Sequence, residues 1–208
     1  MDVSRPYAVF SSPLDLEVLL VLRGTTRPLT GRDVARLVRR GSPAGVQKAL
    51  RRLTGHGIIR AEEAGRALLY TLNRNHLAVP ALEVLADMRA ELEARLRARI
   101  AQWEIAPAHV SIFGSTARGD GDTESDIDLF VVRSPAVDEK NEERWRAQLE
   151  ELASDVRDWT GNHLAVAEVS ERELARLRRE QPPVAESLRR DAITLAGPTP
   201  DRLLGGET

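Results

Sequence analysis

The apolar and polar positions at the start of the chain recur with the spacing of short helices. Apolar residues predict a first helix over 14–22. The capping-box pattern Thr30–Asp33 predicts a second helix that continues to Val38. Ser42, followed by a proline, predicts a third helix, which we expect to end at Gly55 because glycine often terminates helices. The first quarter of the chain is therefore predicted to form three short helices.

A β-hairpin is predicted directly after these helices. Within residues 58–72, the side chains of Leu68, Tyr70 and Leu72 lie two positions apart and are expected to face the interior. Three helices followed by a hairpin resemble the winged helix-turn-helix domains that are common in bacterial and archaeal transcription regulators. This resemblance places such a domain over residues 1–78 and implies double-stranded DNA as its partner.

Charge is distributed unevenly along the chain. Residues 31–76 contain nine arginines, one lysine and three acidic residues, which give this stretch a formal charge of +7. Because the net charge of the chain is −2, the remaining residues carry −9. Positive charge confined to one stretch favours a partner that carries phosphates. In the winged-helix interpretation, five side chains of the third helix and the wing contact DNA: Gln47, Lys48, Arg51, Arg52 and Arg66. Two alternatives remain, namely a solvated arginine face and a winged domain used for protein interaction or dimerisation.

One long amphipathic helix is predicted between the two halves of the chain. Within residues 81–103, apolar side chains recur at helical spacing among Glu and Arg: Leu82, Leu85, Met88, Leu92, Leu96, Ile100 and Trp103. A narrow stripe of this kind fits a seam between two helices, so a homodimer is one expectation. Packing of the helix on its own winged domain is the other. We assign residues 79–105 to this linker helix.

The most informative motif lies in the C-terminal half. An apolar strand, Val110–Phe113, ends at Gly114-Ser115, where backbone N–H groups and a hydroxyl can meet an anion. Asp126 and Asp128 lie in a second apolar strand, and both carboxylates face one side because strand side chains alternate. Paired carboxylates repel each other unless a cation binds between them, and Mg²⁺ prefers such oxygen ligands. The motif predicts a phosphate cradle beside a metal-binding carboxylate pair.

Beyond this motif, the pattern predicts an alternation of helices and strands. A helix over 142–160 is followed by a strand over 163–169, and the capping-box residue Ser170 opens a further helix. A last helix and a short strand, 193–196, complete the domain. The tail, residues 198–208, is expected to be disordered.

The combination of Gly114-Ser115, Arg118-Gly119 and Ser125–Asp128 resembles the signature of the polymerase-beta-like nucleotidyltransferase superfamily, specifically its minimal branch in bacteria and archaea. The resemblance implies an α+β chain whose small C-terminal α/β domain, residues 106–197, contains a mixed sheet. It further implies that a nucleoside monophosphate is transferred from a nucleoside triphosphate, expected to be ATP, to a hydroxyl acceptor, with two Mg²⁺ ions. The fused winged domain departs from the minimal pattern.

The resemblance also implies roles for individual residues. Asp126 and Asp128 are implied to be metal ligands and catalytic residues. The phosphates of the nucleotide are implied to lie against Gly114, Ser115 and Arg118.

The superfamily's chemistry requires a third carboxylate, which completes the second metal site or accepts a proton. Glu168 lies in the strand expected beside the aspartate strand and is the candidate for this catalytic and metal-binding role. The alternative is a solvated glutamate on an edge strand. Asp120, Asp122 and Glu124 fall in the loop before the aspartates and are interpreted as solvated.

Composition narrows the remaining classes of function. The chain contains no cysteine, which excludes disulfides and thiolate zinc sites. No uncharged apolar run approaches about 18 residues and the N-terminus lacks the layout of a signal peptide, so we expect a cytoplasmic protein without a membrane partner. Two function classes stay open: a nucleotidyltransferase with a DNA-binding domain, and a DNA-binding transcriptional regulator whose nucleotidyltransferase domain senses nucleotide or is inactive. Because minimal nucleotidyltransferases also act as antitoxins that modify a partner protein, the acceptor is either a protein or a nucleic acid.

Overall fold

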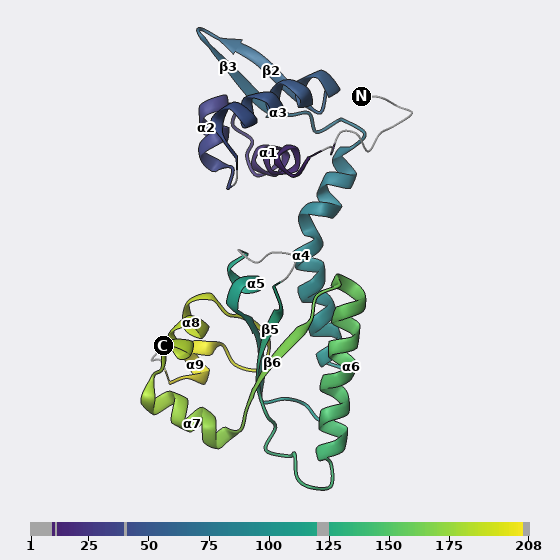
Figure 1. Cartoon of the computed structure of the whole chain (residues 1–208), viewed down its shortest axis with the longest axis vertical. Coiled ribbons are helices and arrows are strands. Elements are labelled where there is room, and N and C mark those ends of the chain that lie inside the picture. The colour runs from purple at the N-terminus through teal and green to yellow at the C-terminus, as the bar shows by residue number, and fades with distance from the viewer. Residues whose placement is uncertain (1–9, 11, 40, 120–124, 206–208) are drawn as a thin grey trace. The chain divides into compact units, whose positions relative to one another are not determined.

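The computed structural model describes residues 10, 12–39, 41–119 and 125–205, and the chain divides into two compact units, residues 1–89 and 90–208 (Figure 1). Each unit is described by itself.

The N-terminal unit combines helices with a small antiparallel sheet in the strand order β1-β3-β2. The predicted helices and hairpin are confirmed, whereas their assignment as a winged helix-turn-helix stays a prediction. The elements are α1 (Pro13–Arg23), β1 (Leu29–Thr30), α2 (Gly31–Leu37), α3 (Pro43–His56), β2 (Ile59–Ala64), β3 (Ala67–Leu72) and the first half of α4 (Val79–Ile100).

The helices of this unit begin where the sequence supplies capping side chains. The Thr30 hydroxyl accepts a hydrogen bond from the Asp33 N–H at 3.2 Å, and the Asp33 carboxylate accepts one from the Thr30 N–H at 3.3 Å. The Ser42 hydroxyl accepts a hydrogen bond from the Gly45 N–H at 3.1 Å. These bonds satisfy N–H groups that have no partner within the helix, so the predicted starts of α2 and α3 are confirmed.

Two details of the predicted N-terminal unit are wrong. Helix α3 continues through Gly55 to His56, because Gly57, with φ +79°, takes the left-handed conformation that ends a helix. Leu68 is 45% exposed instead of facing the core, because it pairs with Glu63 near the hairpin turn, beyond the end of the core.

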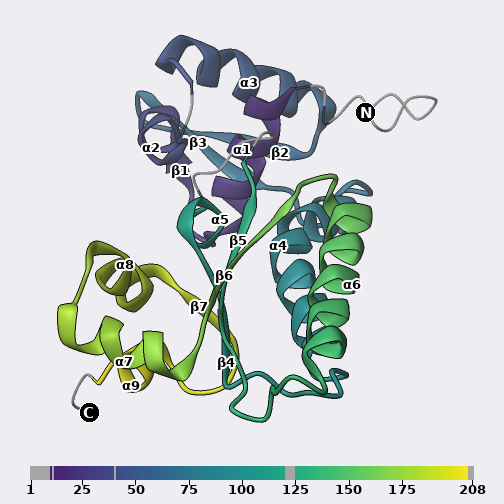
Figure 2. The ribbon, with the colours of Figure 1, turned by 60° about the horizontal axis from the view of Figure 1, so that its bottom comes forward.

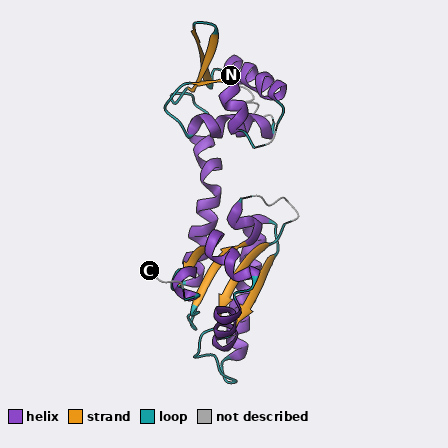
Figure 3. Ribbon diagram, turned by 90° about the vertical axis from the view of Figure 1, so that its left-hand side faces the viewer, coloured by secondary structure: helices purple, strands orange, loops and turns teal. Residues whose placement is uncertain are grey.

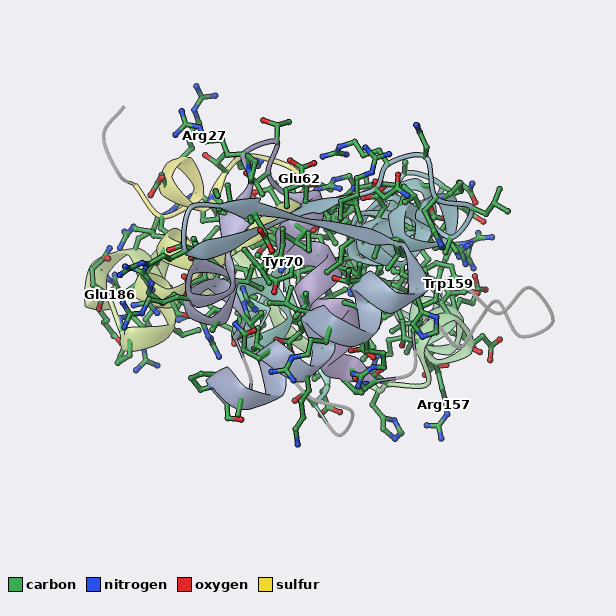
Figure 4. All side chains as sticks on the ribbon, turned by 90° about the horizontal axis from the view of Figure 1, so that it is seen from above. Arg27, Glu62, Tyr70, Arg157, Trp159 and Glu186 are labelled. Atoms are coloured by element: carbon green, nitrogen blue, oxygen red, sulfur yellow. The ribbon has the colours of Figure 1, made fainter. Side chains whose placement is uncertain are left out.

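The alternation along β3 nevertheless places the other two predicted side chains in the interior. Tyr70 and Leu72 are buried, together with Val46, Leu50 and Leu53 of α3. Figure 4 shows Tyr70 beneath the hairpin, whereas Glu62 of β2 lies on its exposed side. The hairpin therefore covers the inner face of α3.

Arg52 of α3, which the sequence assigned to DNA, binds a buried carboxylate of its own unit. The Asp15 side chain is fully buried, and the Arg52 guanidinium donates to Asp15 Oδ2 at 3.0 Å and also contacts Oδ1. A buried carboxylate needs such a partner because its desolvation is costly. Arg52 thus fixes α3 to α1.

Helix α4 contributes to both units, and the division between them falls within it. Leu82 is buried in the N-terminal core, whereas Leu96 and Ile100 are buried in the C-terminal core. The two ends of the predicted apolar stripe are thus buried in two separate cores, whereas Leu85 and Met88 are exposed. Within the described ranges, no helix is long and apolar enough to cross a membrane.

The C-terminal unit contains a mixed four-stranded sheet in the order β6-β5-β4-β7 (Figure 3). Strands β5 and β6 are parallel, and the other neighbours are antiparallel. The mixed sheet that the sequence predicted is confirmed. The elements after α4 are β4 (His109–Phe113), α5 (Gly114–Arg118), β5 (Ile127–Val132), α6 (Glu142–Thr160), β6 (Leu164–Val169), α7 (Glu171–Glu180), α8 (Pro183–Asp191), β7 (Ile193–Ala196) and α9 (Pro200–Leu203).

Helices cover both faces of this sheet, and the strand residues alternate between two cores. α6 and the end of α4 lie on one face, whereas α7, α8 and α9 lie on the other (Figure 2). Leu129 and Val131 of β5 pack toward α6, whereas Phe130 and Val132 pack toward α8. The alternation of this one strand decides which face each functional side chain occupies.

The chain after β7 is ordered as far as it is described, so the predicted disorder of residues 198–205 is wrong. Leu203 and Leu204 are buried beside α8. The Leu203 carbonyl accepts a hydrogen bond from Arg178 at 2.7 Å, and the Leu204 carbonyl accepts one from Arg189 at 3.0 Å. Residues 206–208 lie outside the described residues.

A buried histidine connects the last ordered segment to the sheet. His109 of β4 is fully buried beside Phe130, and its ring nitrogens lie 2.8 Å from the Pro198 carbonyl and 3.0 Å from the Ser111 hydroxyl. Burial lowers the pKa of His109, and the Pro198 carbonyl offsets this only in part. The neutral imidazole is therefore the form that the fold stabilises.

Acidification is expected to destabilise the fold because of His109. Between the lowered folded pKa and the unfolded value of about 6.5, the unfolded chain binds more protons, so acidification favours unfolding. Urea denaturation of the parent protein and of His109→Gln should show a smaller loss of unfolding free energy in the variant between pH 8 and pH 5.5, the difference staying below about 1.4 kcal/mol per pH unit. An equal loss in both proteins contradicts the role of His109.

Candidate functional site

The pairing of β4 with β5 brings the two halves of the sequence motif together. In the antiparallel register, Phe113 lies opposite Asp128. The chain leaves β4 at Phe113 and enters the short helix α5 at Gly114. The backbone of the predicted phosphate cradle is therefore fixed beside the predicted metal ligand.

Gly114 permits an unusually close approach to this carboxylate. Its φ of +68° lies in the left-handed region, and a Cβ atom there would lie 2.3 Å from Asp128 Oδ2. No side chain larger than hydrogen fits without displacing that oxygen. Two physical reasons thus explain why glycine occupies position 114: its backbone conformation and its contact with Asp128.

The two aspartates are close enough for the charge of Asp126 to act on Asp128. Asp126 directly precedes β5 and is exposed, and its carbonyl accepts a hydrogen bond from the Thr116 hydroxyl at 3.4 Å. Burial raises the pKa of the Asp128 carboxyl, the charge of Asp126 raises it further, and Arg118 lowers it. The pair is thus electrostatically unfavourable by itself, and a bound dication would relieve this repulsion.

The other predicted phosphate contacts lie in the same region. Arg118, at the end of α5, is close enough for its charge to act on Asp128. Ser115 is partly buried and lines a cavity of about 280 Å³. Among the described residues, the lining consists of Leu92, Ser115, Thr116, Gly119, Ser125, Ile127, Thr160 and Asn162.

Glu168, the candidate third carboxylate, does lie in the neighbouring strand β6, but on the opposite face of the sheet from Asp128. In the parallel register, Asp128 lies beside Ala165, whereas Glu168 lies beside Val131. Three positions along a strand correspond to about 10 Å, and an odd number of positions reverses the face. Glu168 instead accepts a hydrogen bond from the Trp145 indole at 2.8 Å on the α6 side.

The aspartate-facing side of β6 carries only small side chains beside this site. Ala165 neighbours Asp128, and Ala167 neighbours Phe130. Across the described ranges, no group of three His, Cys, Asp or Glu residues is arranged to hold a metal. Asp120, Asp122 and Glu124 lie outside the described residues.

Sequence reasoning missed the residue that anchors the start of β5. The Asn162 side chain donates a hydrogen bond to the Ser125 carbonyl at 2.9 Å, and the Ile127 N–H donates to the His163 carbonyl at 2.8 Å. These bonds fix the backbone on both sides of Asp126. The contact joins positions 37 residues apart, and no local pattern signals such a pair.

The five residues predicted to contact DNA occupy different environments. Lys48 and Arg51 are exposed on α3, and Arg66 is exposed beside the hairpin turn. Gln47 instead packs against Gly31 of α2. The two residues are so close that a Cβ on Gly31 would lie 2.1 Å from the Gln47 amide nitrogen. The Arg52 side chain is 40% exposed as well, but it binds the Asp15 carboxylate of its own unit.

Comparison with known families supports the assignment of the C-terminal unit. Residues 94–178 match the family model of the nucleotidyltransferase domain. This segment contains Gly114, Ser115, Arg118, Asp126 and Asp128.

Three individual proteins are similar to parts of the chain. The tRNA modification GTPase MnmE of Cereibacter sphaeroides (strain ATCC 17029 / ATH 2.4.9) is 40% identical over 82 residues, which cover 39% of this chain and 19% of that protein. The chain thus matches about a fifth of that relative's length. A crystal structure of a toxin-antitoxin with AMP-PNP shares 18% identity with a TM-score of 0.36, covering 54% of this chain and 79% of that chain. A mutant of the toxin-antitoxin MntA-HpeT gives 16% identity, a TM-score of 0.35 and the same coverage.

Gly114→Ala is expected to disturb the site without a large effect on the fold. Both Gly114→Ala and the control Gly161→Ala should lose about 1 kcal/mol of unfolding free energy, because each places alanine at positive φ. Only Gly114→Ala displaces Asp128, since the space around Gly161 is open. Calorimetric titration with Mg²⁺ and ATP should show binding weakened at least about tenfold in Gly114→Ala alone. Equal binding by the two variants would contradict the site.

Proposed function

We propose that residues 106–197 form a Mg²⁺-dependent nucleotidyltransferase that transfers a nucleoside monophosphate from a nucleoside triphosphate, ATP in the first instance, to a hydroxyl acceptor. The observation that carries the proposal is the position of Asp128 against the backbone of Gly114, with Asp126 close enough for its charge to act on Asp128. The family match over residues 94–178 supports the same class of reaction.

The carboxylate pair suits a hard dication. Asp126 and Asp128 supply oxygen ligands, and their mutual repulsion and the burial of Asp128 favour a bound positive charge. Two such ions would neutralise the triphosphate charge and polarise the reacting oxygens. Asp126 and Asp128 would hold both of them.

The remaining residues of the site bind and orient the nucleotide. Backbone N–H groups of Gly114 and Ser115, the Ser115 hydroxyl and the Arg118 guanidinium offer donors to the β- and γ-phosphates. The acceptor oxygen forms a bond to the α-phosphorus, the bond between the α- and β-phosphates breaks, and pyrophosphate leaves. The proton of the acceptor hydroxyl passes to water.

Ala165 and Ala167 of β6 favour a second candidate function. If transfer needs a carboxylate beside Asp128, a domain with Ala165 at that place binds metal and nucleotide without turnover. The protein would then be a transcriptional regulator in which nucleotide binding adjusts DNA binding. The two candidates share the nucleotide site and differ in whether an acceptor becomes labelled.

Replacement of both aspartates is expected to abolish transfer. The protein is incubated with Mg²⁺, cell extract and each α-labelled nucleoside triphosphate, and the labelled product, protein or nucleic acid, is identified. Asp126→Asn combined with Asp128→Asn should reduce labelling at least about 1000-fold while the circular dichroism spectrum is retained.

Glu168→Gln is the matched control, because Glu168 lies on the opposite face and glutamine still accepts the hydrogen bond from Trp145. Labelling by this variant should stay within about threefold of the parent protein. Undiminished labelling by the double aspartate variant would reject the transferase. Metal-dependent nucleotide binding without any labelling in the parent protein would favour the regulator.

We also propose that the N-terminal unit binds double-stranded DNA through the exposed face of α3 and the hairpin turn. The exposed cations Lys48, Arg51 and Arg66 support this, within a stretch of formal charge +7. Arg52 contributes to stability instead, since it neutralises the buried Asp15.

Lys48→Ala combined with Arg51→Ala should weaken DNA binding and reduce the slope of log affinity against log salt by about 2, one for each lost phosphate contact. Fluorescence anisotropy with a duplex at several salt concentrations measures this slope. Arg52→Ala is the control for the structural role and should lose about 1–3 kcal/mol of unfolding free energy by removing the guanidinium that binds the buried Asp15 carboxylate. An unchanged salt slope in the Lys48/Arg51 variant would contradict the DNA interface.

A further inference from the structure

Asp126 directly precedes the strand ladder that fixes its partner Asp128. Asp128 pairs with Phe113 on one side and with Ala165 on the other. Strand β5, in contrast, begins only at Ile127. Because Mg²⁺ tolerates little departure from octahedral geometry, two carboxylates that share it need a fixed separation. The position of Asp126 must therefore be fixed by contacts other than strand pairing.

Hydrogen bonds from the connection between α6 and β6 hold the backbone on both sides of Asp126. The Asn162 side chain donates from Nδ2 to the Ser125 carbonyl at 2.9 Å, directly before Asp126. The Ile127 N–H, directly after it, donates to the His163 carbonyl at 2.8 Å. The first of these bonds comes from a side chain, so a substitution can remove it without breaking the strand ladder.

Asn162 is itself held in place by the end of α6. Gly161 takes the left-handed conformation with φ +78°, and its N–H donates to the Arg157 carbonyl at 2.8 Å. The Asn162 N–H then donates to the Thr160 hydroxyl at 3.1 Å. Because the backbone and the side chain of Asn162 are both bound, the end of α6 determines where the Ser125 carbonyl lies.

Thr116 of α5 makes a second contact with this segment. Its hydroxyl donates to the Asp126 carbonyl at 3.4 Å, whereas a strong bond between two oxygens is about 2.7 Å long. The bond from Asn162 is therefore the stronger of these two side-chain contacts.

The contact between Asn162 and Ser125 borders the cavity of about 280 Å³, which both residues line. The described lining of this cavity contains hydroxyl and amide groups and no charged side chain. Asn162 therefore acts on Asp126 through the backbone and not through charge. In a variant that lacks the amide, water can enter this polar cavity and bind the Ser125 carbonyl, so the fold is retained while the fixed position is lost.

We infer that Asn162 is a positioning residue of the metal site, because it fixes the Ser125 carbonyl and thereby the separation of the Asp126 and Asp128 carboxylates. Replacing a residue that orients a metal ligand commonly weakens metal binding about 10- to 100-fold. Asn162 holds the backbone beside the ligand, so the lower end of this range, about tenfold, is expected. The inference rests on the proposed function in one respect, since Asp126 and Asp128 must bind the metal, and it does not require turnover.

Binding of Mn²⁺ by the full chain, followed by electron paramagnetic resonance of the free ion, tests this role without turnover. Asn162→Ala should weaken Mn²⁺ binding about tenfold and retain the circular dichroism spectrum of the parent protein. Gln148→Ala is the matched control, because the Gln148 amide also binds backbone, accepting from the Ile105 N–H at 3.0 Å. Gln148 lies about three turns before the end of α6, so this variant should bind Mn²⁺ within about twofold of the parent protein.

A double-mutant cycle separates positioning from a general loss of order. In the Asp126→Asn background, Asn162→Ala should change Mn²⁺ binding less than about twofold, because the ligand that Asn162 positions is already lost. A tenfold loss in both backgrounds would overturn the inference. So would an equal loss in Gln148→Ala, or parent-like binding by Asn162→Ala, and in each case the metal site itself would be retained.

Failure of the proposed function gives a different result. A parent protein that binds no Mn²⁺ would overturn both the positioning role and the proposed function. A parent protein that binds Mn²⁺ in the manner expected for Asn162, but labels no acceptor, would reject the transferase alone and support the positioning role.

Discussion

The antiparallel register of β4 and β5 is the constraint on which the candidate site depends. It places Phe113 opposite Asp128, so that the chain turns into α5 directly beside that carboxylate. The positive φ of Gly114 and its lack of a Cβ atom then allow the Asp128 carboxylate to lie against the Gly114 backbone. The predicted phosphate cradle and metal ligands thus lie at the same end of one strand pair, and a register shift of one residue would separate them.

The same alternation explains why the sheet has one functional face and one structural face. Asp128 lies on the side of α8, whereas Glu168 lies on the side of α6 and accepts a hydrogen bond from the Trp145 indole. The register of β5 with β6 therefore places the Glu168 carboxylate on the other face from Asp128. Ala165 occupies the position beside Asp128 instead.

Local patterns predicted most of the fold, since caps and period-two alternation act within a few residues. The capping boxes of α2 and α7, the long helix α6 and the aspartate pair were all predicted in this way. Contacts between residues distant in sequence were not predicted, because no local signal indicates that Arg52 neutralises Asp15 or that Asn162 anchors Ser125. The sheet face on which Glu168 lies could not be predicted for the same reason. It depends on the register between two strands rather than on either strand alone.

The central claim is that Asp126, Asp128 and the backbone at Gly114 form one metal-nucleotide site. Calorimetric titration of a non-hydrolysable ATP analogue tests it most directly, with Mg²⁺ and then with excess EDTA. The account predicts saturable binding with Mg²⁺ and at least about tenfold weaker binding in EDTA, because the carboxylate pair repels the triphosphate without a cation. Equal binding under both conditions, or no binding with Mg²⁺, would contradict it.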